Sequence, residues 1–151
     1  MKLFHTSPNE ISTITSAGRF GSFLFFSARI YTMTAGEAVV YSLEIDDDSI
    51  VEAGRLFYHE DAARLQPLVD ELAARLDIEE ATAEALIEES MTAHDLAGID
   101  MEDAGDLSWD VQHFTARAAA LLGYRGVAVR DEQGTSYLID MAGREADLVR
   151  V

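Results

Sequence analysis

The sequence predicts an α+β fold, on three observations. Short segments rich in β-branched and aromatic residues occur near both ends of the chain, segments with helical spacing of apolar residues lie between them, and a Gln-Gly turn signal stands inside the C-terminal group. A helical insert between two β groups is typical of α+β proteins. The 151 residues, 48% of them hydrophobic, suit one domain spanning residues 1–151.

Three strands are expected in the N-terminal part. The segment KLFHTS (2–7) ends at a Ser-Pro break, because proline lacks the N–H that a ladder needs. The segment SFLFFSA (22–28) is too rich in aromatic residues to be fully exposed. The segment EAVVYSLEI (37–45) alternates in part and stops at the turn-forming sequence DDDS.

Helices are expected next. The segments HEDAARLQPLVDELAARL (59–76) and EEATAEALIEESM (79–91) place their leucines, alanines and isoleucine at helical spacing. Pro67 leaves two possibilities open, a helix that begins there or one that is kinked. The acidic segment AGIDMEDAGD (97–106) indicates a loop, after which Ser108 is expected to cap a third helix that Gly123 closes.

A hairpin follows the third helix. Gly126–Arg130 and Thr135–Ile139 are its expected strands, and Asp131 and Glu132 stand side by side at the mouth of its turn. Two acidic residues at a turn are usually exposed to solvent and have no catalytic role, so this pair alone does not predict an active site. The last residues, ADLVRV (146–151), are expected to form an edge strand.

Charge and composition exclude several classes of function. Eleven basic against 28 acidic residues give a formal net charge of −17, which argues against direct binding to nucleic acid and favours a basic partner or solubility alone. The chain has no cysteine, which fits the cytosol and excludes a disulfide framework or a thiolate site. No basic segment followed by a long apolar run is seen, so we expect a soluble, cytoplasmic protein with no membrane span.

Few known motifs are present. The four histidines lack the spacing of a zinc site, so we expect no metal. No nucleophile elbow, P-loop or dinucleotide-binding glycine pattern occurs. What is left is a histidine on the first strand, aromatic residues on the second, and the acidic pair at the last hairpin.

Three segments carry a resemblance to a known family. LFHTSPNEI (3–11), GRFGSFLFF (18–26) and WDVQHFTARAAALLGYRGVAVRDEQGTSYLID (109–140) resemble the small ADP-ribosyltransferases of the anti-CRISPR family that inactivates type I-F surveillance complexes. More distantly, their order is similar to that of diphtheria-toxin-like ADP-ribosyltransferases. The resemblance implies two small antiparallel β-sheets that form a cleft for NAD, with the helical insert between the N- and C-terminal β groups.

The resemblance also implies how the donor substrate NAD is held. His5 would fix a ribose hydroxyl, and the backbone at Thr6 would grip the nicotinamide amide, although the family more often has glycine there for close approach. Phe25, Phe26 and Tyr31 could stack on the nicotinamide ring, because a flat, partly cationic ring favours an aromatic face. The alternative for each of these aromatic residues is a place in the core.

The same resemblance assigns the acid. Breaking the nicotinamide–ribose bond generates positive charge on the ribose, which a nearby carboxylate stabilises more than it stabilises the ground state. Asp131 is the candidate for this carboxylate, with Glu132 as the alternative or as a helper that orients the acceptor. Ser27 would support the acid, and Arg19 or Arg29 would pair with the pyrophosphate.

Three functions are therefore open. The first is an NAD-dependent protein mono-ADP-ribosyltransferase, carried by a phage or mobile element, that modifies a side chain of a type I-F CRISPR surveillance complex and blocks target DNA recognition. By family analogy the acceptor is an asparagine on the subunit that recognises the protospacer-adjacent motif. The second is a non-enzymatic acidic anti-CRISPR that occupies a basic DNA channel. The third is an ADP-ribosyltransferase with another host protein as acceptor. The oligomeric state is open.

Overall fold

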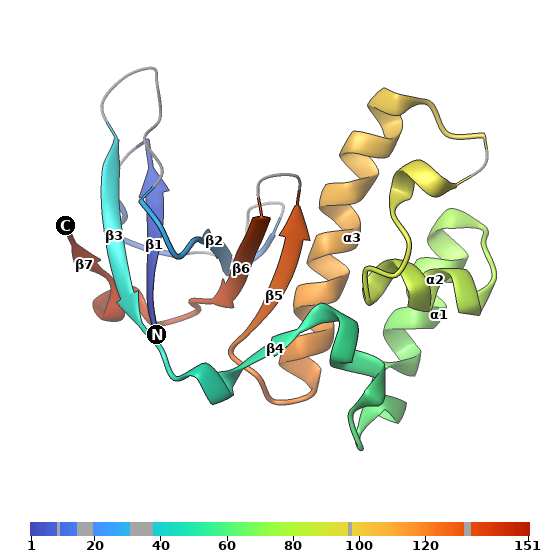
Figure 1. Cartoon of the computed structure of the whole chain (residues 1–151), viewed down its shortest axis with the longest axis horizontal. Coiled ribbons are helices and arrows are strands. Elements are labelled where there is room, and N and C mark those ends of the chain that lie inside the picture. The colour runs from blue at the N-terminus through green and yellow to red at the C-terminus, as the bar shows by residue number, and fades with distance from the viewer. Residues whose placement is uncertain (9, 15–19, 31–37, 97, 132–133) are drawn as a thin grey trace.

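A computed structural model of the chain describes residues 1–8, 10–14, 20–30, 38–96, 98–131 and 134–151. Two small sheets lie side by side, and the helices pack beside the second of them (Figure 1). The first sheet has the order β1 (Lys2–Ser7), β3 (Val39–Glu44), β7 (Val149–Arg150). The second has the order β2 (Phe23–Phe26), β6 (Gly134–Asp140), β5 (Gly126–Asp131), β4 (Ile50–Glu52). The predicted α+β class, with an edge strand near the C-terminus, is confirmed.

The second sheet is mixed, which corrects the expectation of two purely antiparallel sheets. Its strand β4 pairs with β5 in parallel, while the other pairings are antiparallel. Two adjacent parallel strands need a long crossover connection, and the helical insert between Glu52 and Gly126 supplies it. A three-residue strand of this kind has too short a pattern to be recognised in the sequence.

Three α-helices form the insert: α1 (Gln66–Leu76), α2 (Glu80–Ile87) and α3 (Met101–Leu121). Pro67 occupies the first turn of α1, where its missing N–H has no intrahelical role, so of the two possibilities the helix begins there. Short 3₁₀ turns connect the elements at Asp47–Ser49, Ala53–Tyr58, Ala62–Leu65, Ala93–Asp95 and Glu145–Asp147.

The predicted start of the third helix was wrong. The helix begins at Met101 behind the N-cap Asp100, and Ser108 lies inside it, where its hydroxyl donates to the carbonyl of Ala104 at 2.9 Å. Acids in a first turn interact favourably with the helix dipole, so the acidic segment that indicated a loop suits a helix start equally well. The predicted end at Gly123 is confirmed, since its φ of +92° closes the helix.

Two apolar cores hold these layers together. The larger lies between the helices and the second sheet, and the smaller lies between the two sheets. Val127 and Val129 of β5 are fully buried in the larger core. Because side chains alternate along a strand, Ala128 and Arg130 lie on the opposite face of β5 from these two valines. Within the described residues, no helix is long and apolar enough to cross a membrane.

Candidate functional site

The first strand holds the second through His5. Its Nδ1 lies 2.6 Å from the carbonyl oxygen of Phe25, and one residue earlier Phe4 exchanges two backbone hydrogen bonds with Ser27, at 2.8 and 2.9 Å. The two sheets are therefore joined at the end of β2. This contact brings together four of the residues singled out in the sequence: His5, Phe25, Ser27 and, next to His5 on β1, Thr6.

The protonation of His5 follows from this contact. A carbonyl oxygen can only accept, so Nδ1 carries the proton and Nε2 of the neutral ring is left as an acceptor. Burial lowers the pKa of His5, and the hydrogen bond to Phe25 only partly opposes that effect. At neutral pH the ring is consequently neutral and presents an acceptor nitrogen, which is what binding of a hydroxyl donor requires.

The aromatic pair of β2 divides between the two faces of the sheet. Phe26 is 2% exposed and belongs to the core between the sheets, with its ring centroid 5.5 Å from that of His5. Phe25 is half-buried on the helix side, where its ring meets those of Phe20 and Trp109 edge-on, at 4.9 and 5.8 Å. Of the two, Phe25 keeps surface that a ligand could contact.

The hairpin end lies at the same end of the second sheet as this group. The last residue of β2, Phe26, pairs with Tyr137, and the antiparallel β6 continues in that direction for three more residues to Gly134. Asp131 is the last residue of β5 and pairs with Gly134. The side chain of Asp131 lies outside what the structure describes, as do the residues Glu132, Arg19 and Tyr31.

Ser27 and Arg29 lie in the segment that follows β2. Ser27 is half-buried, and its hydroxyl donates to the carbonyl oxygen of Arg29 at 2.5 Å. Arg29 itself is exposed, which leaves its guanidinium accessible to solvent.

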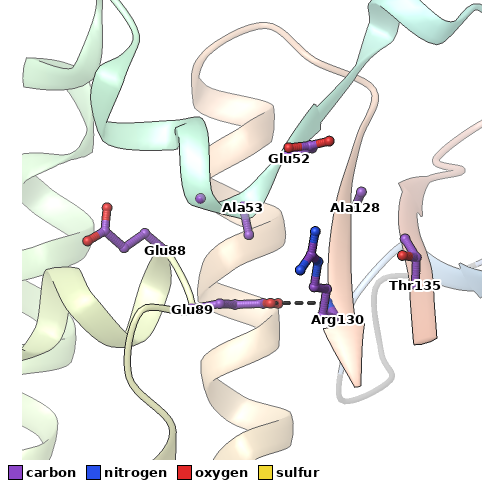
Figure 2. Close-up of a pocket in the computed structure, with 8 residues that line it drawn as sticks. Glu52, Ala53, Glu88, Glu89, Ala128, Arg130 and Thr135 are labelled. Atoms are coloured by element: carbon purple, nitrogen blue, oxygen red, sulfur yellow. Dashed lines mark hydrogen bonds between the residues drawn. The ribbon is translucent and has the colours of Figure 1, made fainter. Parts of the chain in front are cut away.

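A pocket of about 250 Å³ lies on the other side of the hairpin, between the end of α2 and the strands β4 and β5 (Figure 2). Arg130 and Thr135, which pair across the hairpin, form one wall. Three carboxylates also line it, those of Glu52, Glu88 and Glu89. The Glu89 carboxylate accepts a hydrogen bond from the backbone N–H of Arg130 at 3.0 Å.

Sequence reasoning missed two residues at these places. Trp109 is the chain's single tryptophan and is 46% exposed although it contacts Phe25. The signal in the sequence was its place as the first residue of the segment 109–140, which carries part of the family resemblance. Glu89 stands 41 residues before its partner Arg130, and no spacing rule links a helix end to a strand so far along the chain. Among the described residues, no group of three or more side chains suits a metal ion.

Comparison with known proteins identifies a family and a similar solved structure. Residues 1–146 match the family model described as "Anti-CRISPR Type I-F ADP-ribosyltransferase AcrIF11". A solved structure described as "Crystal structure of an anti-CRISPR protein" is similar to this chain, with 26% sequence identity and a TM-score of 0.55 over 92% of this chain and 88% of that one. No curated protein matches the sequence.

Proposed function

The chain belongs to the anti-CRISPR type I-F ADP-ribosyltransferase family AcrIF11, and from this premise we propose that it transfers ADP-ribose from NAD to a side chain of a type I-F CRISPR surveillance complex in the bacterial cytosol. The acceptor is proposed to lie on the subunit that recognises the protospacer-adjacent motif, so that its modification blocks DNA entry. The observation that carries the proposal is the hydrogen bond from His5 to the carbonyl oxygen of Phe25, because it fixes the tautomer of the imidazole and leaves Nε2 as an acceptor for a hydroxyl.

The donor end of NAD is assigned to the group around His5. The neutral imidazole accepts from a ribose hydroxyl through Nε2, and the backbone at Thr6 binds the nicotinamide amide. Phe25 provides an aromatic surface for the nicotinamide ring, with Tyr31 as a second candidate. Phe26 supports His5 from the core side, since it is buried against the imidazole.

The reaction is a substitution at the ribose carbon. The bond between that carbon and the nicotinamide nitrogen breaks, nicotinamide leaves with the electron pair, and a nucleophilic atom of the acceptor side chain forms the new bond and loses a proton. Positive charge develops on the ribose in between, and the carboxylate of Asp131 stabilises it. Glu132 is the alternative acid or the group that orients the acceptor, Ser27 supports the acid, and Arg19 or Arg29 pairs with the pyrophosphate.

The test is the intact mass of each subunit of a purified type I-F complex after incubation with catalytic amounts of the protein and NAD. We expect one subunit to gain one ADP-ribose, and Asp131→Asn to lose transfer by about two orders of magnitude or more while its circular dichroism spectrum is unchanged. The matched control is Asp48→Asn, an exposed carboxylate in the turn before β4. Full transfer by the double variant Asp131→Asn, Glu132→Gln would rule this site out.

The net charge of −17 favours one alternative, an acidic protein that occupies a basic DNA channel without chemistry. Its inhibition would need no NAD, would survive Asp131→Asn, and would require one protein per complex. Transfer to a different host protein, with the complex unmodified, would instead keep the enzyme and change its acceptor.

A further inference from the structure

The two ends of β5 differ in how they are covered on the side of β4. Strand β4 pairs with residues Gly126–Ala128 and then turns away, so residues 129–131 extend past its end. An edge of this kind presents backbone groups that need partners. The N–H of Arg130 points to this edge and donates to Oε2 of Glu89 at 3.0 Å (Figure 2).

Glu89 makes this contact from an unusual backbone position. It follows α2 with a φ of +63°, its own N–H donates to the carbonyl of Leu86 at 3.2 Å, and the N–H of Met91 donates to that of Ala85 at 3.2 Å. Glycine or asparagine is favoured where a helix closes in this left-handed conformation, which costs other residues about 1–2 kcal/mol. The turn alone therefore gives no reason for a glutamate at this position. The hydrogen bond to β5 gives one, because it needs a side-chain acceptor.

The contact spans the pocket described above. The pocket separates the end of α2 from the end of β5, and both Glu89 and Arg130 line it. The hydrogen bond between them joins the helical insert to the hairpin across this gap. The hydrogen bond adds to the packing of Val129 against the helices, and it acts one residue further along β5.

From this geometry we propose that Glu89 is a positioning residue for Asp131. By holding the N–H of Arg130, it fixes the direction of β5 where the next residue is the acid. The proposal rests on the proposed function, in which Asp131 stabilises the charge on the ribose. Glu89 itself contacts neither NAD nor the reacting atoms in this scheme.

The test compares three variants with the wild type. Glu89→Gly removes the acceptor and relieves the backbone strain, whereas Glu89→Gln keeps an acceptor oxygen without the charge. The matched control is Asp77→Gly, since Asp77 is an exposed acid that ends α1 with a φ of +53°. The measurements are kcat and KM for NAD in the transfer to the complex, the melting temperature, and the hydrogen-exchange rate of the Arg130 amide.

For Glu89→Gly we expect kcat to fall about 10- to 100-fold with KM for NAD nearly unchanged, because a small displacement of a catalytic group has effects of that size. The Arg130 amide should exchange faster in this variant, Glu89→Gln should restore most of both properties, and Asp77→Gly should match the wild type. Wild-type kcat in Glu89→Gly, an equal loss in Asp77→Gly, or unchanged exchange at Arg130 would each overturn the proposal.

Failure of the proposed function has a different signature. If Asp131→Asn keeps full transfer, Asp131 is not the acid and the positioning role falls with it. Exchange of the Arg130 amide needs no substrate, so it still decides whether Glu89 anchors the end of β5.

Discussion

The ends of β2 and β5 meet the candidate site from two directions, and they are held differently. At the end of β2, two backbone hydrogen bonds between Phe4 and Ser27 are reinforced by the imidazole of His5, which donates to a carbonyl. At the end of β5, the carboxylate of Glu89 accepts from an N–H. In both cases a side chain from another element forms a hydrogen bond with a backbone group at the end of a strand.

The difference lies in how much else supports each end. The end of β2 adjoins the core between the sheets, through the buried Phe26, whereas the end of β5 borders a pocket. The first end is thus fixed by packing and backbone pairing as well as by a side chain. The second is paired with β6 as far as Asp131 and buries Val129 on the helix side, while on its other edge the N–H of Arg130 donates to Glu89.

The largest effect on stability is expected from a substitution at Gly126, the first residue of β5. A Cβ atom on Gly126 would lie 2.7 Å from the backbone oxygen of Leu138 and 2.3 Å from Cδ1 of Ile139, so Gly126→Ala must displace β5 from β6. We expect the free energy of unfolding in urea to fall by about 1–3 kcal/mol. The control is Gly105→Ala in α3, where a Cβ meets nothing within 4 Å and stability should rise by about 1 kcal/mol. Unchanged stability in Gly126→Ala would mean that β5 is not fixed at its start.

The sequence predicts those parts of the fold that depend on residues close together in the chain. The aromatic run of β2 and the hairpin around the Gln-Gly turn follow from alternation and turn chemistry, and the helical spacing of the insert follows from its leucines. The short strand β4 and the first turns of α3 depend on partners elsewhere in the chain, and acids suit a loop and a helix start alike.

The site divides in the same way. His5 could be singled out because a resemblance pointed to it, but its hydrogen bond to Phe25 crosses 20 residues and its tautomer follows only from that bond. Glu89 could not be found, because its left-handed backbone and its partner on β5 are products of tertiary packing. Residue types predict chemistry, and the contacts that orient them belong to the fold.

A smaller effect is expected from removing the imidazole of His5, which extends from β1 to the end of β2. His5→Ala leaves the partly buried carbonyl of Phe25 without the imidazole and removes the proposed hydroxyl acceptor. We expect binding of NAD, measured by calorimetry, to weaken about tenfold, which corresponds to about 1.4 kcal/mol. The exposed His94 provides the control variant His94→Ala, with wild-type affinity. Equal affinities for all three proteins would separate His5 from the NAD site and leave it a purely structural contact.

The smallest effect concerns pH and should distinguish the two strand ends, since only that of β2 is held by a histidine. Burial lowers the pKa of His5 and of His113 from the ordinary value of 6.5, so the unfolded chain takes up protons first as the pH falls. The free energy of unfolding should therefore decrease as the pH drops below 6.5 and level off below the folded pKa values. Urea unfolding between about pH 7.5 and 5.5 should show a shallower decrease in His5→Gln than in the wild type. An identical pH dependence in both proteins would contradict a buried, neutral His5, and with it the acceptor nitrogen on which the binding of NAD is proposed to depend.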